Sequence, residues 1–259
     1  MIHTPFFLHR SRFLRTICSG LLRRYANTFL NRYLVERRMG VLLFLDQKNA
    51  VDKHLLYRGV WEAEQIAFLT EAFKANSKEG EKTVFLDIGS HAALYSIILQ
   101  SKVGLDEIFA FEPVPSNLVQ LRVNLLMNGC SSKVTVVEAA VANEVGLTQF
   151  IVAADRNRGM SRILDGSLED EELLIEVKTI TIDGFRDFNN CLILAKVDVE
   201  GAEMSVLKGM HRTLRNNRCI LQIERNRGDF SEMNSELESL GFHLLRSIGP
   251  DYFFSNVGD

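Results

Sequence analysis

Paired cysteines and long apolar runs are both missing from this chain of 259 residues. The four cysteines, Cys18, Cys130, Cys191 and Cys219, lie far apart and form no C-x-x-C pair, which argues against a disulfide framework or a structural zinc site. No apolar run approaches the roughly 18 residues that a membrane-spanning helix needs. These absences predict reduced thiols, a reducing compartment such as the cytoplasm, and no membrane span.

The glycine-rich fingerprint of dinucleotide-binding enzymes is missing as well. Where the first strongly apolar run ends, the chain reads Asp87-Ile88-Gly89 and contains no G-x-G-x-x-G. No residues suited to hydride transfer are evident either. A nicotinamide-dependent oxidoreductase is therefore weakly supported.

Basic residues are concentrated at the amino end. Residues 1–40 carry eight arginines against the single acid Glu36, whereas the remainder carries 22 Lys and Arg against 32 Asp and Glu. Apolar residues at helical spacing over 14–25, with arginines opposite, predict a basic amphipathic helix. It could cover the domain, lie on anionic lipid, or be a transit peptide. We separate residues 1–58, a basic amphipathic N-terminal extension, from a domain over 59–259.

Short apolar runs then alternate with amphipathic segments. A strand ending at Asp87, a helix from Leu94 and a strand ending at Glu112 predict a βαβ unit, and runs over 242–248 and 251–255 predict a hairpin. Further predicted elements are the strands 41–45, 134–141, 150–152, 176–182, 192–199 and 219–224 and the helices 61–74, 116–127, 202–214 and 231–240. The predicted fold is α/β, a Rossmann-like seven-stranded, mostly parallel sheet with a C-terminal β-hairpin and an N-terminal helical extension, as in class I methyltransferases.

Carboxylates end every predicted parallel strand, where an open α/β sheet binds its ligands. They are Asp87, Glu112, Glu138, Asp198 with Glu200, and Glu224. In one cleft they would repel one another unless a cationic or hydroxyl-rich ligand lay among them; alternatively, each acid caps the helix that follows. Because Glu112 suits the two hydroxyls of a ribose, the pattern indicates an adenosine-type cofactor.

Several segments, in this order and spacing, resemble the FkbM family of methyltransferases. They are FLDIGSHAALYS, FAFEPVPSNLVQLRVNLLMNG, VTVVEAAVAN, VKTITIDGF, KVDVEGAEMSVLKG and LQIER, within roughly residues 60–256. The most distinctive are K-x-D-V-E-G-x-E over 196–203 and F-E-P over 111–113. The resemblance implies methyl transfer from S-adenosylmethionine to a hydroxyl oxygen of a small molecule or glycan.

The resemblance also implies roles for individual residues. The cofactor contacts would be Asp87, Gly89 and Ser90 at the methionine end, Glu112 at the ribose, and Glu138 with Ala140 beside the adenine. Asp198 and Glu200, two apart on an extended strand end, would face the methyl donor and the acceptor hydroxyl, which one of them would orient or deprotonate. Lys196, one layer deeper on the same side, would neutralise the carboxylates.

One position departs from the family pattern. Where that pattern reads D-x-G-A-x-x-G, this chain has Ala93 in place of the second glycine. A Cβ there costs little in a helical backbone, but of order 1 kcal/mol if the turn needs a positive φ. The alternative function is therefore a non-catalytic binding or anchoring module with impaired cofactor binding, and cofactor affinity discriminates the two.

Two segments outside the strand ends are candidates for covering the site. Trp61, with Glu62 and Glu64, lies just before the core and is predicted to cover the cofactor pocket as a lid; alternatively, Trp61 packs against the sheet. The loop over 157–166 lies near the expected acceptor site. With Arg156, Arg158 and Arg162, it either binds an anionic group of the substrate or is a solvated basic loop.

The sequence says less about nucleic acids, membranes and metal ions as partners. Beyond residue 40 the chain is acidic and would repel phosphates, so no specific nucleic-acid partner is expected. Peripheral membrane contact through residues 1–40 stays open. No metal site is predicted, although Asp198, Glu200 and Glu224 could form one if they converged.

Overall fold

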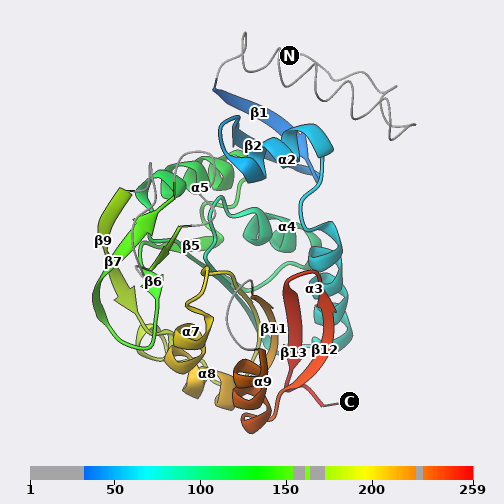
Figure 1. Ribbon diagram of the computed structural model, residues 1–259. Coiled ribbons are helices and arrows are strands. Elements are labelled where there is room, and N and C mark those ends of the chain that lie inside the picture. Colours follow the sequence, from blue (N-terminus) through cyan, green and yellow to red (C-terminus); the bar gives the residue numbers. More distant parts are fainter. Residues whose placement is uncertain (1–31, 154–160, 164–172, 226–229, 259) are drawn as a thin grey trace.

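A computed structural model describes residues 32–153, 161–163, 173–225 and 230–258. The predicted amphipathic helix over 14–25 lies outside the described residues, as does most of the loop over 157–166. The described chain folds as a central sheet with helices on both faces, a smaller second sheet and an N-terminal hairpin (Figure 1).

Seven strands make the central sheet. They are β3 (Lys82–Ile88), β4 (Glu107–Phe111), β5 (Val134–Val137), β10 (Cys191–Val197), β11 (Arg218–Glu224), β12 (His243–Ile248) and β13 (Asp251–Ser255). Their order is β12-β13-β11-β10-β3-β4-β5, parallel throughout except for β13, which pairs antiparallel with both neighbours. The predicted seven-stranded, mostly parallel sheet with a C-terminal hairpin is confirmed.

Helices cover the two faces of this sheet. One face carries α3 (Ala63–Asn76), α4 (Leu94–Val103) and α5 (Pro115–Met127); the other carries α6 (Ile182–Phe185), α7 (Glu203–Gly209), α8 (His211–Asn216) and α9 (Phe230–Ser239). Strand β3 shows why both faces are apolar, because Phe85 packs with α4 and α5 whereas Val84 and Leu86 pack with α7 and α8. The predicted helix over 202–214 is wrong as a single element, since non-helical backbone at Met210 divides it.

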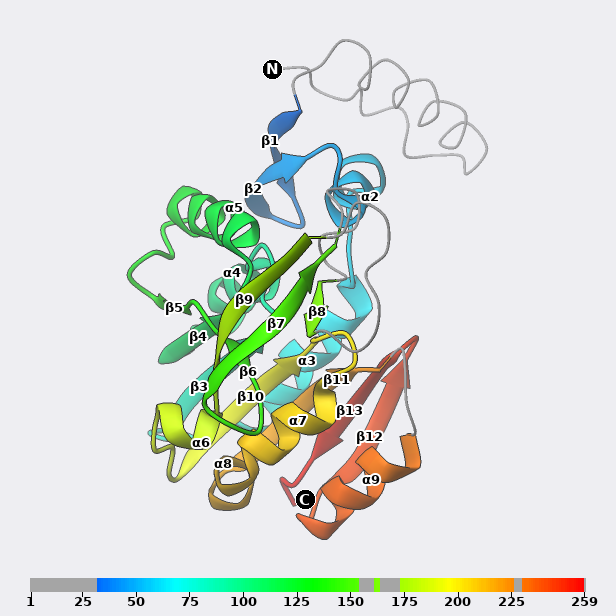
Figure 2. The same ribbon diagram turned by 60° about the vertical axis from the view of Figure 1, so that its left-hand side comes forward.

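A second sheet packs beside the first (Figure 2). It contains β6 (Ala140–Val141), β7 (Gly146–Val152), β8 (Arg162–Ile163) and β9 (Leu173–Ile180), in the order β6-β9-β7-β8. The single strand predicted over 134–141 is therefore wrong. A tight turn, in which the Ala139 amide donates to the Val137 carbonyl at 3.0 Å, ends β5 and sends β6 to pair with β9.

The amino end of the described chain is a hairpin and a helix. Strands β1 (Tyr33–Arg38) and β2 (Val41–Asp46) pair antiparallel and precede α2 (Ala50–Arg58). The two-residue loop has positive φ at Met39 (51°) and Gly40 (88°), as a type I′ turn requires. The strand predicted over 41–45 is confirmed, but the described part of the predicted helical extension is a hairpin followed by one helix.

Side-chain amides of α5 attach this hairpin to the domain. Gln120, Asn124 and Asn128 lie one helical turn apart and face the free edge of β2. The Phe44 amide donates to Asn124 Oδ1 (2.7 Å) and the Phe44 carbonyl accepts from Gln120 Nε2 (2.8 Å), while Asn128 bonds both backbone groups of Leu42 (3.0 and 2.7 Å). The amides thus pair an edge strand that would otherwise expose its backbone groups.

Apolar side chains also cross the predicted boundary at residues 58 and 59. Leu43 of β2 and Leu55 of α2 are buried in one cluster with Leu69 of α3 and Ile97 of α4. The N-terminal cover, residues 41–62, therefore shares a core with the sheet domain.

Candidate functional site

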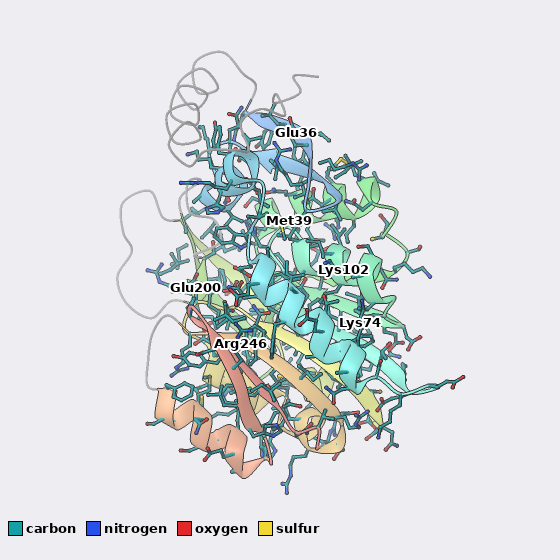
Figure 3. All side chains as sticks on the ribbon, turned by 90° about the vertical axis from the view of Figure 1, so that its right-hand side faces the viewer. Glu36, Met39, Lys74, Lys102, Glu200 and Arg246 are labelled. Carbon is teal, nitrogen blue, oxygen red and sulfur yellow. The ribbon has the colours of Figure 1, made fainter. Side chains whose placement is uncertain are left out.

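A cavity of about 400 Å³ lies at the carboxyl ends of β3, β4 and β10, beneath the N-terminal cover. Eight residues predicted as site residues line it: Asp87, Gly89, Ser90, Glu112, Ala140, Lys196, Asp198 and Glu200. Figure 3 shows Glu200 at the end of the sheet that faces the N-terminal cover. The strand ends therefore converge on one site, as expected for an open α/β sheet.

The turn after β3 is shaped by backbone contacts. Gly89 and Ser90 donate their amides to the Phe111 carbonyl of β4 at 3.1 and 3.0 Å. Gly89 has φ +81°, and a Cβ built on it would lie 1.9 Å from the carbonyl oxygen of Asp198. Only glycine fits where the turns after β3 and β10 approach so closely.

Ala93 ends this turn in the left-handed region. It precedes α4 with φ 60° and ψ 28°, and its side chain is fully buried. The turn thus needs a positive φ where the family pattern has glycine. The alanine costs of order 1 kcal/mol at this position.

Glu112 lies at one end of the cavity, with its carboxylate among backbone amides. Its oxygens accept from the amides of His91 (2.9 Å) and Val114 (2.8 Å) and, at 3.3 Å, from Asn117 Nδ2. Burial outweighs these bonds and raises the pKa of Glu112 to about 7. Because an ionised carboxylate offers about four acceptor sites, Glu112 retains capacity for a ligand hydroxyl.

Charged groups gather at the other end of the cavity. Lys196 Nζ pairs with Asp198 Oδ2 at 2.7 Å, and Asp87 accepts from Ser96 Oγ at 2.6 Å. Burial raises the pKa of Asp87. Burial alone lowers the pKa of Lys196, but the charges of Asp198, Glu62 and Asp87 outweigh it and hold that pKa above its usual value.

Glu62, a residue of the predicted lid, and Tyr95 join this cluster, although neither was predicted as a contact of the cofactor or of the acceptor. The Tyr95 hydroxyl donates to Glu62 Oε2 at 2.6 Å and accepts from Gln222 Nε2 at 2.9 Å, and the Tyr95 ring lies 5.0 Å from Lys196 Nζ. Burial raises the pKa of Glu62. No sequence spacing connects positions 62, 95 and 196; the acid beside Trp61 was the one available signal.

The turn after β10 differs from its predicted shape. The strand ends at Val197, and Glu200 and Gly201 have φ 52° and 108°. The expected extended backbone through Glu200 is therefore wrong, although Asp198 and Glu200 both line the cavity. Within the described ranges, no three His, Cys, Asp or Glu side chains are placed to hold a metal ion.

Comparison with known proteins decides the family. Residues 87–244 match the model of the methyltransferase FkbM domain. This chain belongs to the FkbM methyltransferase family. It is 25% identical over 187 residues to "Methyltransferase 1" of Beauveria bassiana (62% of this chain, 73% of that protein). It is 27% identical over 203 residues to "Methyltransferase sdnD" of Sordaria araneosa (65% and 78%).

Solved structures include an FkbM methyltransferase as well. The one from Methylobacillus flagellatus superposes with a TM-score of 0.46 and 16% identity, over 94% of this chain and 59% of that one. Membership of the FkbM family makes this chain an S-adenosylmethionine-dependent methyltransferase.

The residues of this FkbM chain fit that cofactor. Glu112 keeps acceptor capacity for a ribose hydroxyl at one end of the cavity. At the other end, Glu62, Asp87 and Asp198 surround the single ammonium of Lys196, an environment that favours a cationic ligand. A sulfonium and an α-ammonium carry such charges.

Buried amide atoms give a further sign of a ligand. Asn49 and Asn117 line the cavity and are 0% and 2% exposed. Asn49 Nδ2 and Asn117 Oδ1 have no hydrogen-bond partner among the described residues, although the other atom of each amide is bonded. Buried polar atoms without partners are rare, and these two belong to residues of the cavity wall, where a bound molecule can supply the missing partners.

Glu138 lies away from the cavity. Its exposed side chain pairs with Arg122 on α5, whereas its neighbours Ala139 and Ala140 line the cavity. The predicted contact of Ala140 with adenine stays a prediction, and the structure gives the Glu138 side chain a partner on the surface instead.

Covering segments reach the cavity from two sides. Trp61 lines it from the N-terminal cover, in edge contact with His54 at 5.2 Å between ring centroids. Ser161 and Ile163 line it from the second sheet, while Arg158 lies outside the described residues. In the part of the chain that is described, no helix is long and apolar enough to cross a lipid bilayer.

Proposed function

We propose that this FkbM chain is an O-methyltransferase that transfers the methyl group of S-adenosylmethionine to a hydroxyl of a small molecule or glycan. One observation carries the proposal. A single cavity joins Glu112, suited to ribose hydroxyls, to the cluster of Lys196, Asp198, Asp87 and Glu62, suited to a cation. The proposed sulfonium end thus lies beside carboxylates that can also receive an acceptor hydroxyl.

Asp198 is the proposed contact of the acceptor hydroxyl. Its carboxylate is partly exposed, with 23% of its side-chain surface accessible, whereas Lys196 is 7% accessible. The bound cofactor supplies an electrophilic methyl group. Asp198 would accept a hydrogen bond from the acceptor hydroxyl and orient its oxygen toward that methyl group. The proton that the hydroxyl loses on methylation would pass to a carboxylate or to water. Positioning supplies much of the rate in such a displacement.

Glu200 is the proposed second carboxylate at the acceptor. Its left-handed backbone brings it to the cavity wall two residues beyond Asp198, in the same turn. Lys196 is a positioning residue here, because its ion pair at 2.7 Å fixes the Asp198 carboxylate.

One specific observation supports a second candidate function. The left-handed Ala93 costs stability in the turn that approaches the cofactor, as expected of a module that has lost cofactor binding. The cavity and the bonds of Glu112 are nevertheless intact. Catalysis is therefore the first candidate, and cofactor affinity discriminates it from the second.

Titration calorimetry of the full chain with S-adenosylmethionine and S-adenosylhomocysteine tests the proposal. Micromolar binding is expected, and Glu112→Ala should weaken it by about 10- to 100-fold, because hydrogen bonds to a charged group contribute about 1.5–3 kcal/mol. Unchanged affinity in Glu112→Ala would contradict the proposed pocket. Formation of S-adenosylhomocysteine in a screen of hydroxylated compounds and glycosides then identifies the acceptor.

A further inference from the structure

Glu62 belongs to the N-terminal cover, outside residues 87–244 that match the family model. It is half-buried, lines the cavity, and precedes α3 with a left-handed φ of 45°. A non-glycine residue in this region stores strain, which persists where the surrounding structure holds it. Here the Tyr95 hydroxyl, 2.6 Å from Glu62 Oε2, fixes the carboxylate.

Lys196, the cation that interacts with Glu62, is already paired with another carboxylate. Lys196 Nζ makes its ion pair with Asp198 at 2.7 Å. In the described chain, Glu62 has no cation within ion-pair distance, and the Tyr95 hydroxyl is its hydrogen-bond donor. Three carboxylates therefore share one ammonium at this end of the cavity, so a ligand that brings a second ammonium there gains electrostatic energy.

Tyr95 does not change the net charge at this end of the cavity, because its hydroxyl stays neutral. Burial and the adjacent Glu62 raise the pKa of Tyr95, so the hydroxyl stays protonated and donates to the carboxylate. Gln222 holds the other side of this hydroxyl at 2.9 Å and itself donates to Asp251 at 2.8 Å. One oxygen of Glu62 is thus fixed by the protein, and the other has capacity for a ligand donor.

We propose that Glu62 binds the α-ammonium of the methionine moiety of the cofactor, so that the N-terminal cover supplies part of the cofactor site. The proposal rests on the proposed function, because it takes S-adenosylmethionine as the ligand. An independent sign that a ligand enters this cavity is the unpartnered, buried Oδ1 of Asn117. The ligand thus spans from Glu112 to Glu62, and binding ties the cover to the sheet domain.

The test crosses one substitution with one change in the ligand. Glu62→Gln keeps the size of the side chain and an oxygen for the Tyr95 hydroxyl, but removes the charge. Calorimetry compares S-adenosylhomocysteine with its deaminated analogue, which keeps the carboxylate and lacks the ammonium. Glu62→Gln should lower the affinity for S-adenosylhomocysteine about tenfold or more. It should change the affinity for the deaminated analogue less than about twofold.

Glu64→Gln is the matched control. Glu64 lies two residues further along in α3, is exposed, and pairs with Arg246 on β12 at 2.6 Å. This variant should leave both affinities unchanged. If Glu62→Gln does not fold, Glu62→Asp replaces it. The aspartate keeps the charge but is one methylene shorter, so this variant should lower the affinity for S-adenosylhomocysteine more than the affinity for the deaminated analogue.

Three outcomes separate the explanations. Selective loss for the ligand with the ammonium supports the proposal. Equal losses for both ligands would make Glu62 a structural residue and overturn it, while cofactor binding stands. Failure of the native chain to bind S-adenosylhomocysteine overturns this proposal and the proposed function together.

Discussion

The turns after β3 and β10 meet at the floor of the cavity but contribute different things to it. The first, over 89–93, is held by backbone bonds to β4 and shapes the floor. The second, over 198–201, carries the side chains Asp198 and Glu200 and follows Lys196. Both contain non-glycine residues at positive φ, His91 and Ala93 in the first and Glu200 in the second.

The first turn determines the shape of the pocket, and the second carries its charged side chains. Gly89 lets the two turns touch, since no Cβ fits against the Asp198 carbonyl. A change in the first turn should therefore disturb folding and the shape of the pocket. A change in the side chains of the second should disturb chemistry before it disturbs the fold.

The largest effect is expected where the two turns touch. Gly89→Ala places a Cβ 1.9 Å from the Asp198 oxygen at φ +81°, and should cost about 3 kcal/mol in the free energy of unfolding measured with urea. Gly104→Ala is the control, because its φ is +65° with nothing within 4 Å of the added Cβ, and it should cost about 1 kcal/mol. Equal costs would mean that the contact between the turns is unimportant.

Charge in the second turn is tested by Asp198→Asn. With an acceptor identified by the screen, kcat should fall about 100-fold, because the amide orients the hydroxyl less well and accepts no proton. Calorimetric affinity for S-adenosylhomocysteine should change less than about threefold. Full turnover in this variant would remove Asp198 from the mechanism.

Glu112 holds the first turn through the His91 amide, and its ionisation should appear in the pH dependence of stability. Its pKa is about 7 in the folded chain against an ordinary 4.5, so between these values the folded state retains a proton that the unfolded state has lost. Stability therefore falls as pH rises through this window. Glu112→Gln removes this contribution, and its Tm should fall less than that of the native chain from pH 5 to pH 7.5. Parallel Tm curves would refute the assignment.

The smallest effect is expected at Ala93. Ala93→Gly relieves the left-handed alanine and should stabilise the chain by about 1 kcal/mol in urea unfolding. Affinity for S-adenosylhomocysteine should stay within about twofold. A gain of tenfold or more would instead favour the binding module with impaired cofactor affinity.

Local patterns predicted most of the central sheet because each strand is an apolar run with its own end signal. Val84 to Leu86 before Asp87, and Ile108 to Phe111 before Glu112, are decided by a few adjacent residues. The break of the strand predicted over 134–141 was not predictable in this way. It depends on the pairing of β6 with β9, which lies about forty residues away along the chain.

In the candidate site too, contacts between residues close in sequence were predictable and contacts between distant segments were not. Lys196 and Asp198 are two residues apart on one strand end, so their pairing followed from strand periodicity. Glu62 with Tyr95, and Asn124 with Phe44, come from separate elements that only folding brings together.

By itself, the sequence determined the alternation of strands and helices, the acids at the strand ends and the resemblance to one family, because these properties depend on neighbouring residues. The tertiary structure decided the left-handed Ala93, the surface pairing of Glu138 and the hairpin held by the amides of α5. It also decided that Glu62 faces Lys196. These features depend on contacts between distant segments, whose geometry is fixed by how the helices and the cover pack on the sheet.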